Sequence, residues 1–551
     1  MKDVLKIFAL GGLGEFGKNF LVVCQGQDAI ILDCGAQFSD GRNPGLDIII
    51  PDFTPALDES LIIHGLLLTH AHEDHIGSVP YFLHKRNVPV YGSKFTQALV
   101  SHKCREFFHR IKLTYEVIDE HQAFDVGPFH ITPVAMAHSI PEALAFFVDT
   151  KLGTLFHTGD FKIDPGPADG RFTDLEKIAT VASEKKMLLL TSDSTNVLVP
   201  GHSRAETSII EGLQKAFEQT KGKLVITSFS SHIPRIYQVC QLAHKNNRKV
   251  LLMGRSILQN VETAKQLGHM NVPEKIFVDE EQASKLPPHE LLIIATGTQA
   301  EPRAALSKMV FGQIKGITLG EGDLVVYSSR AIPGHERSIY HMINHIYRLG
   351  AQAWTWEDER VHVSGHGYKE DLATIIKTIR PKYMVPVHGE LKMLKEHQKL
   401  AISCGVKSQN TFFMENGDVL EIDHEGANIT HRLELSPKLV DQGMLVDLAA
   451  TYLKDRKKIS TQGTIIIVLT VDKDGLELLH DPVVIEYGFI EEGHSKELIE
   501  EIQDQVEREL FKLSKKPFHG DLDQQVRMWV SRTCRNVINR KPVIVPIIID
   551  A

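Results

Sequence analysis

The chain has 551 residues, of which 42% are hydrophobic and 24% charged, and its formal net charge is −9 at pH 7. This length exceeds one ordinary hydrophobic core, so we expect a globular protein of several domains. The charge does not suggest a nucleic-acid binder, but it does not exclude one, because affinity for phosphates depends on local basic patches. No uncharged apolar stretch approaches the roughly 18 residues that span a bilayer, so we expect no membrane partner.

Six cysteines are scattered through the chain without a CxxC pair. Their spacing argues against a disulfide framework and against a thiolate zinc site, and it fits a reducing compartment. The N-terminus carries one short apolar run that ends in two glycines and lacks the length of a secretory signal. We therefore expect a cytoplasmic protein.

Gly12, Gly14 and Gly17 spell G-x-G-x-x-G directly after the apolar run 5–10. A dinucleotide-binding fingerprint requires a helix next, but residues 18–26 (KNFLVVCQG) are typical of a strand. We expect a hairpin turn here and no nucleotide cofactor.

Short β-rich runs separated by polar turns fill the first ~200 residues. Many of these runs end in His or Asp, and open α/β architectures place their sites along such a rim. The predicted strands are 21–26, 29–35, 64–70, 88–93, 130–138, 143–150, 153–160 and 186–194.

The run THAHEDH at 69–75 contains three imidazoles and a carboxylate: His70, His72, Asp74 and His75. Such side chains bind zinc or manganese. Because they are almost adjacent in the chain, one ion is not expected to take all four. We predict that His70 and His72 bind one ion, and that Asp74 and His75 bind a second. The alternative for this stretch alone is a solvated, histidine-rich loop.

Three other predicted strand ends complete this set. His138, Asp160 and His388 each follow a β-rich run, and each taken alone would be an ordinary polar residue. Together they can finish two coordination shells, with Asp160 bridging the ions through its two oxygens and His388 closing the second shell. Two ions about 3.5–4 Å apart can stabilise an in-line displacement at phosphorus. We expect two divalent ions, with zinc favoured and manganese as the alternative.

Two more aspartates follow strands. Asp33 lies two residues before Gly35, and Asp193 lies in LLLTSDSTN. We interpret both as acceptors that orient ligand histidines, and simple turn formation is the alternative.

The rest of the chain changes its pattern twice. Residues 205–365 alternate amphipathic helices with apolar strands, which predicts a parallel sheet with covering helices. Residues 382–390 (KYMVPVHGE) then return to the earlier pattern of a strand that ends in histidine. We predict a first domain in two parts (1–204 and 366–440), an inserted domain (205–365), a linker (441–459) and a terminal α+β domain (460–551).

These motifs resemble a known family. Asp33, the HAHEDH run, His138 and Asp160 occur in an order that is similar to the metallo-β-lactamase superfamily. The insertion, followed by HVSGHG at 362–367 and PVHGE at 386–390, resembles the nucleic-acid-processing β-CASP group. Within that group the whole chain resembles the ribonuclease J family, also through GGLGEFGKN at 11–19 and TGDFKIDPGPADG at 158–170. It departs from the family pattern at Gly367, where alanine is usual, and at His232, where asparagine is common.

The resemblance implies an αββα metallo-β-lactamase sandwich with an inserted β-CASP domain and a small C-terminal domain. It also implies a ribonuclease of RNA maturation and decay, which degrades single-stranded 5′-monophosphorylated RNA from the 5′ end and also cuts internally. We expect a homodimer or homotetramer. The alternatives are a small-molecule hydrolase, such as a lactonase or thioesterase, and an RNA-binding scaffold with vestigial catalysis.

The resemblance also implies residue roles. His366 would stabilise or protonate the leaving oxygen, and Ser364 would hold a phosphate. Weaker candidates for the phosphate pocket are Ser230, Ser231 and His232. The catalytic residues implied in this way are His366, Asp74, Asp33 and Asp193.

Overall fold

The computed structural model describes residues 3–38, 48–108, 112–332, 334–441, 444–447, 451–472, 477–489, 495–515, 518 and 520–551. The chain forms two compact units. The first comprises residues 1–38 and 49–437, and the second comprises residues 438–551 with 39–48. None of the described helices is both long and apolar enough to cross a membrane.

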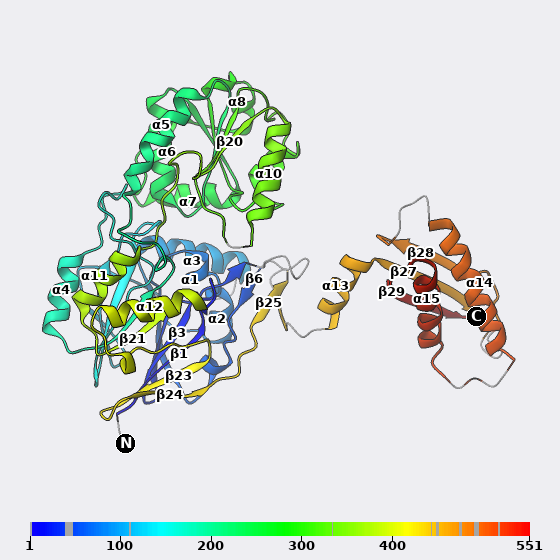
Figure 1. Cartoon of the computed structure of the whole chain (residues 1–551), viewed down its shortest axis with the longest axis horizontal. Helices are drawn as coiled ribbons and strands as arrows, with labels where there is room; N and C mark the ends of the chain where they lie inside the picture. The colour runs from blue at the N-terminus through cyan, green and yellow to red at the C-terminus, as the bar shows by residue number, and fades with distance from the viewer. Residues whose placement is uncertain are drawn as a thin grey trace. The chain divides into compact units, whose positions relative to one another are not determined.

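The first unit contains two sheets that pack face to face (Figure 1). One has the strand order β24-β23-β1-β3-β4-β7-β8-β9. Its strands are β1 (Leu5–Gly11), β3 (Phe20–Gln25), β4 (Asp28–Leu32), β7 (Ile62–Leu67), β8 (Val90–Gly92), β9 (Tyr115–Val117), β23 (Asp418–Ile422) and β24 (Ala427–Arg432). Strand β3 runs antiparallel to β1, so the glycines between them form a hairpin connection, as predicted, and no helix follows them.

The second sheet has the order β10-β11-β12-β13-β14-β21. Its strands are β10 (Phe124–Val126), β11 (Phe129–Ala135), β12 (Leu144–Thr150), β13 (Gly153–His157), β14 (Met187–Asp193) and β21 (Tyr383–Val387). Strands β13, β14 and β21 are parallel, so their carboxyl ends meet at one edge. The short pair β2 (Leu13–Gly14) and β22 (Gly389–Glu390) lies just beyond that edge. Strands β5 (Gln37–Phe38) and β6 (Ile48–Ile50) complete the strands of this region.

Alternation along β12 explains the layers. Phe146 and Val148 belong to the core between the two sheets, whereas Ala145 and Phe147 face a second core under helices. Successive strand side chains point to opposite faces, so an unbroken apolar run indicates a strand buried on both sides. The helices over that second core are α4 (Leu175–Glu184), α11 (Lys369–Ile379) and α12 (Leu391–Ser403). Helices α1 (Glu73–Ile76), α2 (Val79–Lys85) and α3 (Lys94–Phe107) belong to the side of the other sheet (Figure 1).

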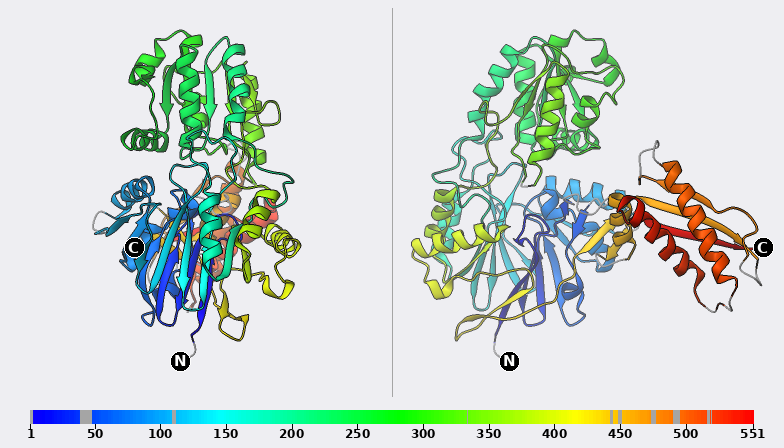
Figure 2. Two further views of the ribbon diagram at one scale, coloured as in Figure 1. Left: turned by 90° about the vertical axis from the view of Figure 1, so that its left-hand side faces the viewer. Right: turned by 45° about the vertical axis from the view of Figure 1, so that its right-hand side comes forward.

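The inserted domain is a parallel sheet of order β17-β16-β18-β15-β19-β20. Its strands are β15 (Leu224–Thr227), β16 (Lys249–Met253), β17 (Phe277–Val278), β18 (Leu291–Ala295), β19 (Leu324–Tyr327) and β20 (Gln352–Trp354). Figure 2 shows helices on both faces of this sheet, as an all-parallel sheet requires. They are α5 (Ile210–Gln219), α6 (Ile233–Lys245), α7 (Arg255–Gln266), α8 (Glu280–Ser284), α9 (Ala305–Val310) and α10 (Glu336–Arg348).

The second unit ends in a three-stranded sheet, β28-β27-β29. Its elements are β25 (Lys438–Asp441), β26 (Met444–Asp447), α13 (Thr451–Gln462), β27 (Thr464–Val471), β28 (Val483–Tyr487), α14 (Ser495–Leu513), α15 (Leu522–Ile538) and β29 (Val543–Asp550). Alternate residues of β27 pack with α14 and α15 into one core. The segment 441–459, which we expect from the sequence to be a linker, contains β26, which pairs with β25, and the first part of α13.

Candidate metal centre

Seven potential metal ligands gather at the carboxyl edge of the sandwich. His70 follows β7, His138 follows β11, Asp160 follows β13, and His388 follows β21. His72 precedes α1, and Asp74 and His75 lie on its first turn. The segment around Gly35 packs closely against this turn. A Cβ at Gly35 would lie 1.6 Å from the carbonyl oxygen of Asp74, so only glycine allows this approach.

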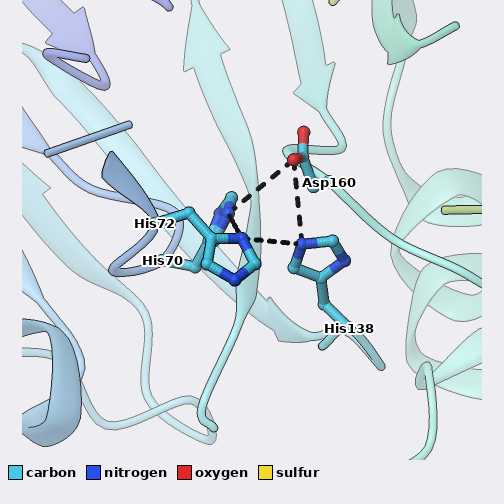
Figure 3. Close-up of side chains that lie close together, drawn as sticks. All are labelled: His70, His72, His138 and Asp160. Carbon is cyan, nitrogen blue, oxygen red and sulfur yellow. Dashed lines mark hydrogen bonds and ion pairs between the residues drawn. The ribbon is translucent and has the colours of Figure 1, made fainter. Parts of the chain in front are cut away.

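The first ligand set contains three imidazoles and one carboxylate: His70, His72, His138 and Asp160 (Figure 3). Nδ1 of His72 lies 3.0 Å from Nε2 of His70 and 3.1 Å from Nε2 of His138. Asp160 Oδ2 lies 3.7 Å from each of the latter two nitrogens. Ligand atoms around a tetrahedral zinc ion are about 3.3 Å apart, given zinc–nitrogen distances near 2.0 Å. The spacing of this set fits such an ion.

Proton positions support the same conclusion. His138 Nδ1 lies 2.8 Å from the carbonyl oxygen of Gly365, which can only accept, so Nε2 of a neutral His138 carries a lone pair. The Thr69 hydroxyl donates to Asp33 and therefore accepts from Nδ1 of His70, which leaves a lone pair on His70 Nε2 as well. Both lone pairs face His72 Nδ1, which has at most one proton to offer. A cation at the centre satisfies all three nitrogens.

The second ligand set contains Asp74, His75, Asp160 and His388. Asp74 Oδ2 lies 3.5 Å from Nε2 of His75 and 3.1 Å from Nε2 of His388. Asp160 Oδ2 lies 3.2 Å and 3.6 Å from the same two nitrogens. One oxygen of Asp160 therefore belongs to both sets, whereas we predict from the sequence one oxygen for each ion. Its Oδ1 is buried and has no hydrogen-bond partner among the described residues, so it too is free for a cation.

Buried acceptors orient the ligand imidazoles. Asp33 Oδ2 accepts from Nδ1 of His75 at 2.7 Å, and Asp33 Oδ1 accepts from the backbone N–H of Thr69 at 2.8 Å. His388 Nδ1 lies 2.8 Å from the hydroxyl of Thr195 and 3.5 Å from Asp193. Such partners hold a ring nitrogen toward a metal.

The two sets have opposite electrostatics. Burial, and then the neighbouring imidazoles, lower the pKa of His70 well below its ordinary value, and burial with His138 lowers the pKa of His72 to about 3. Burial alone would also lower the pKa of His75, but Asp160, Asp74 and Asp33 hold that pKa well above its ordinary value. The first set thus offers neutral nitrogens, whereas the second is dominated by carboxylates that attract positive charge.

His366 borders both sets. Its Nδ1 lies 2.8 Å from Asp193 and 3.9 Å from Asp160, and its ring stacks on that of His388 at 5.4 Å. Burial would lower the pKa of His366, but Asp193 and Asp160 raise it above the ordinary value. A protonated imidazole beside the ligand cluster can donate a proton to an oxygen bound there.

Ser364 is held next to His366 by a residue that we did not predict. Asn196 Nδ2 donates to Ser364 Oγ at 2.7 Å and to the carbonyl oxygen of His366 at 3.0 Å. Thr195 and Asn196 lie two and three residues after the predicted Asp193 in the sequence. That adjacency was the available signal, but their partners lie about 170 to 190 positions away, beyond the reach of local pattern.

The remaining three candidates lie between β15 and α6. Ser230 and Ser231 are half-buried, and the carbonyl of Ser230 accepts from Asn260. His232 is 3% exposed and caps α6, because its Nδ1 accepts from the backbone N–H of Arg235. Among the described residues, no hydrogen bond joins these three to Ser364 or His366, so their role in a phosphate pocket stays a prediction.

Comparison with known protein families gives four matches along the chain. They are a β-lactamase superfamily domain (42–226), the ribonuclease J β-CASP domain (221–346), a Zn-dependent metallo-hydrolase RNA specificity domain (359–410) and the ribonuclease J C-terminal domain (451–551). These matches confirm the predicted fold class of a metallo-β-lactamase fold with a β-CASP insertion and a C-terminal module.

Curated relatives cover nearly the whole chain. A ribonuclease J of Corynebacterium glutamicum is 37% identical over 99% of this chain and 76% of its own length. A ribonuclease J of Mycolicibacterium smegmatis is 36% identical, covering 99% of this chain and 97% of its own. A ribonuclease J of Helicobacter pylori is 34% identical, over 92% and 73%.

Among solved structures, a protein of unknown function from Enterococcus faecalis shares the fold. Its TM-score is 0.54 at 16% identity, covering 76% of this chain and 99% of that one. The domain matches and the relatives together establish that the chain belongs to the ribonuclease J family of metal-dependent ribonucleases.

Proposed function

We propose that the chain is a two-metal ribonuclease that degrades 5′-monophosphorylated, single-stranded RNA from the 5′ end and also cuts it internally, in cytoplasmic RNA maturation and decay. The observation that carries the proposal is the single oxygen of Asp160 shared by two complete ligand sets, with His366 beside it. All six cysteines are free, as a reducing cytoplasm requires. We propose zinc as the metal, with manganese as the alternative.

The first part of the proposal concerns the metals. Two divalent ions would supply Lewis acidity and an activated nucleophile at a scissile phosphate. His70, His72 and His138 would hold one ion, Asp74, His75 and His388 would hold the other, and Asp160 would join them. Asp33 would keep His75 in the tautomer that a metal requires, through the 2.7 Å contact at Nδ1.

The second part concerns the leaving group. His366 has a raised pKa and a 20% exposed side chain, so it can reach substrate while it carries a proton. We assign it the transfer of that proton to the leaving oxygen. Asp193, fully buried and 2.8 Å from Nδ1, would keep the imidazole protonated and turn Nε2 outward.

The third part concerns the 5′ phosphate. Ser364, held by Asn196, would donate its hydroxyl to a phosphate oxygen. Ser230, Ser231 and His232 are the remaining candidates for that pocket. A positioned terminal phosphate fixes the register of the next bond to be cut, which is how a binding site can select exonucleolytic cleavage.

The proposal is tested with a defined RNA that carries either a 5′ monophosphate or a 5′ triphosphate, incubated with zinc or with manganese. We expect stepwise shortening of the monophosphorylated RNA. His72→Ala should empty the first set and Asp74→Ala the second, and each should abolish cleavage. His130→Ala, at an exposed histidine of β11, is the matched control and should cleave normally. Full activity in either ligand variant would contradict the proposal, as would turnover of lactones or thioesters in place of RNA.

We also propose that the chain forms a homodimer or homotetramer through its terminal sheet. One face of β28 and β29 exposes apolar side chains: Val483, Ile485, Tyr487, Val545, Ile547 and Ile549. Contiguous exposed apolar surface of this kind marks an interaction site. Ile547→Lys should lower the mass in solution, whereas Lys496→Glu, on α14 of the same unit, should leave it unchanged. An unchanged mass in the first variant would remove this support for self-association.

A further inference from the structure

Four charged side chains are buried together outside the candidate metal centre: Lys162, Asp164, Glu206 and Arg235, all at most 4% exposed. Lys162 Nζ lies 2.7 Å from Asp164 and 3.6 Å from Glu206. The Arg235 guanidinium donates two hydrogen bonds to the Glu206 carboxylate, of 2.6 and 3.0 Å. Apolar residues of similar volume often stabilise such a position equally well, so a buried charge cluster calls for an explanation other than stability.

Every N–H of the Arg235 guanidinium can be satisfied. Beyond Glu206, Nη1 donates to the carbonyl oxygen of Ser328 at 3.0 Å and to Nδ1 of His362 at 3.1 Å. Nη2 donates to the carbonyl oxygen of Val363 at 3.3 Å. One planar group from α6 therefore joins the end of β19 to the segment 361–366, which carries Ser364 and His366.

Arg235 holds the first half of that segment, and the candidate site holds the second half. The Ser328 hydroxyl, itself bound by Arg235, donates to the carbonyl oxygen of Val361 at 2.6 Å. The carbonyl oxygen of Gly365 binds His138, and Asn196 binds the next residue along. The polypeptide is thus fixed on both sides of Ser364.

Glu206 connects Arg235 to the segment that contains Asp160. Its backbone N–H donates to Asp164, at 3.2 and 3.3 Å from the two carboxylate oxygens. Lys162, which pairs with Asp164, lies two residues after Asp160 and donates its backbone N–H to the carbonyl oxygen of Ala137 at 2.9 Å. The cluster therefore touches the segment that carries the shared carboxylate as well as the segment that carries His366.

The neighbouring imidazoles are neutral. Burial first, and then the Arg235 charge, lower the pKa of both His232 and His362 well below the ordinary value. A neutral His362 can accept from Arg235 at Nδ1, which places its own proton on Nε2. The cluster thus contains two positive and two negative charges and is balanced internally.

We propose that Arg235 is a positioning residue for RNA cleavage, which acts with Glu206 to fix His366 and Ser364 relative to Asp160. This inference rests on the proposed function, because it assigns no chemistry to Arg235 itself. The planar fork of arginine makes the contacts to Glu206, Ser328, His362 and Val363 simultaneously, and a lysine ammonium cannot reproduce that geometry. A positive charge alone is therefore not enough.

The decisive variant is Arg235→Lys, which keeps the charge and removes the fork. A small misplacement of catalytic groups costs on the order of 100-fold in rate. We expect kcat on 5′-monophosphorylated RNA to fall by about 10- to 100-fold, with KM changed less and two metals still bound per chain. Hydrolysis of bis(p-nitrophenyl) phosphate should be largely kept, because its leaving group departs without a proton from His366.

Arg248→Lys is the matched control. Arg248 is also a buried arginine of the inserted domain, but its guanidinium donates, among the described residues, to the carbonyl oxygens of Thr220, Gly222 and Leu291, far in the sequence from 361–366. Its lysine variant should cleave RNA within about twofold of the unchanged protein.

A second variant, Glu206→Met combined with Arg235→Met, removes both charges and leaves the Lys162–Asp164 pair balanced, so no unpaired charge prevents folding.

Two further readouts complete the test. Guanidinium ion at millimolar concentration should partly restore RNA cleavage to Arg235→Ala, and it should not stimulate Arg248→Ala. RNA cleavage within twofold in folded Arg235→Lys or in the double Met variant would overturn the inference, as would equal loss of RNA and small-diester turnover together with loss of metal. If the unchanged protein with metal fails to cleave RNA, the proposed function fails instead, and the small-diester assay reveals that case separately.

Discussion

The two ligand sets share one oxygen of Asp160 and differ in almost everything else. In the first set, neutral imidazoles point at one another, and their outer nitrogens bind a threonine hydroxyl and a backbone carbonyl. In the second set, the imidazoles lie among carboxylates, and Asp74 leaves 32% of its side chain exposed. The difference indicates that the first set offers neutral nitrogens to a cation, whereas carboxylates dominate the second set, and that His366 borders both.

The largest expected effect breaks both sets at once. Asp160→Ala removes the oxygen that each set uses, so we expect loss of RNA cleavage and a fall in metal content at both positions. Elemental analysis of the purified variant and an RNA digestion measure the two effects. Retention of two metals per chain would mean that the sets do not depend on a common ligand.

The next effect should spare both sets. His366→Ala removes the proposed proton donor while leaving the seven candidate ligands in place, so we expect kcat on RNA to fall by about 100- to 10,000-fold. Metal content should remain at two per chain. A variant with normal kcat, measured under saturating RNA, would assign the proton transfer to another group.

A smaller effect should distinguish the sets from each other. Thr195→Val keeps the shape of the side chain but removes the hydroxyl that orients His388 from 2.8 Å. Loss of such an orienting partner lowers metal affinity by about 10- to 100-fold. Metal titration should show weakening of one site and an unchanged second site. Equal weakening of both would contradict the division into two sets.

The smallest effect concerns stability in acid. His397 of α12 is fully buried, and its Nδ1 contacts Ser194, which in turn donates its backbone N–H to the carbonyl oxygen of His388. Burial lowers the pKa of His397 to about 4. The unfolded chain binds this proton below about pH 6.5, and the folded chain only below about pH 4. The free energy of unfolding therefore falls by about 3 kcal/mol as the pH falls through that window.

Urea unfolding of the metal-free protein at pH 7 and pH 4.5 tests this assignment. His397→Leu should show a smaller loss of stability between the two pH values than the unchanged chain, whereas the exposed His121→Leu should not. An identical pH dependence in both variants would show that His397 does not titrate in this window.

The sequence revealed the strands of the inserted domain and of the sandwich, but not the contacts between these two regions. Apolar runs with a polar residue at the end predicted the strands of both, and the HAHEDH run predicted a division between two ions, which stays a prediction until metals are measured. The buried cluster around Arg235 was invisible, because its members are separated by up to 73 positions and each looks like an ordinary surface charge. Burial turns them into partners, and burial is a property of the folded chain.

The amino-acid sequence by itself determined the family, the fold class and the candidate ligand types, because strand periodicity and short motifs are local. The tertiary structure alone decided which atoms meet: that Asp160 offers one oxygen to both sets, that Asn196 holds Ser364, and that Arg235 reaches the segment of His366. The physical reason is that strand order and crossovers bring together segments hundreds of positions apart, such as Asp74 and His388, which are separated by 314 positions, and such contacts leave no periodic trace in the sequence.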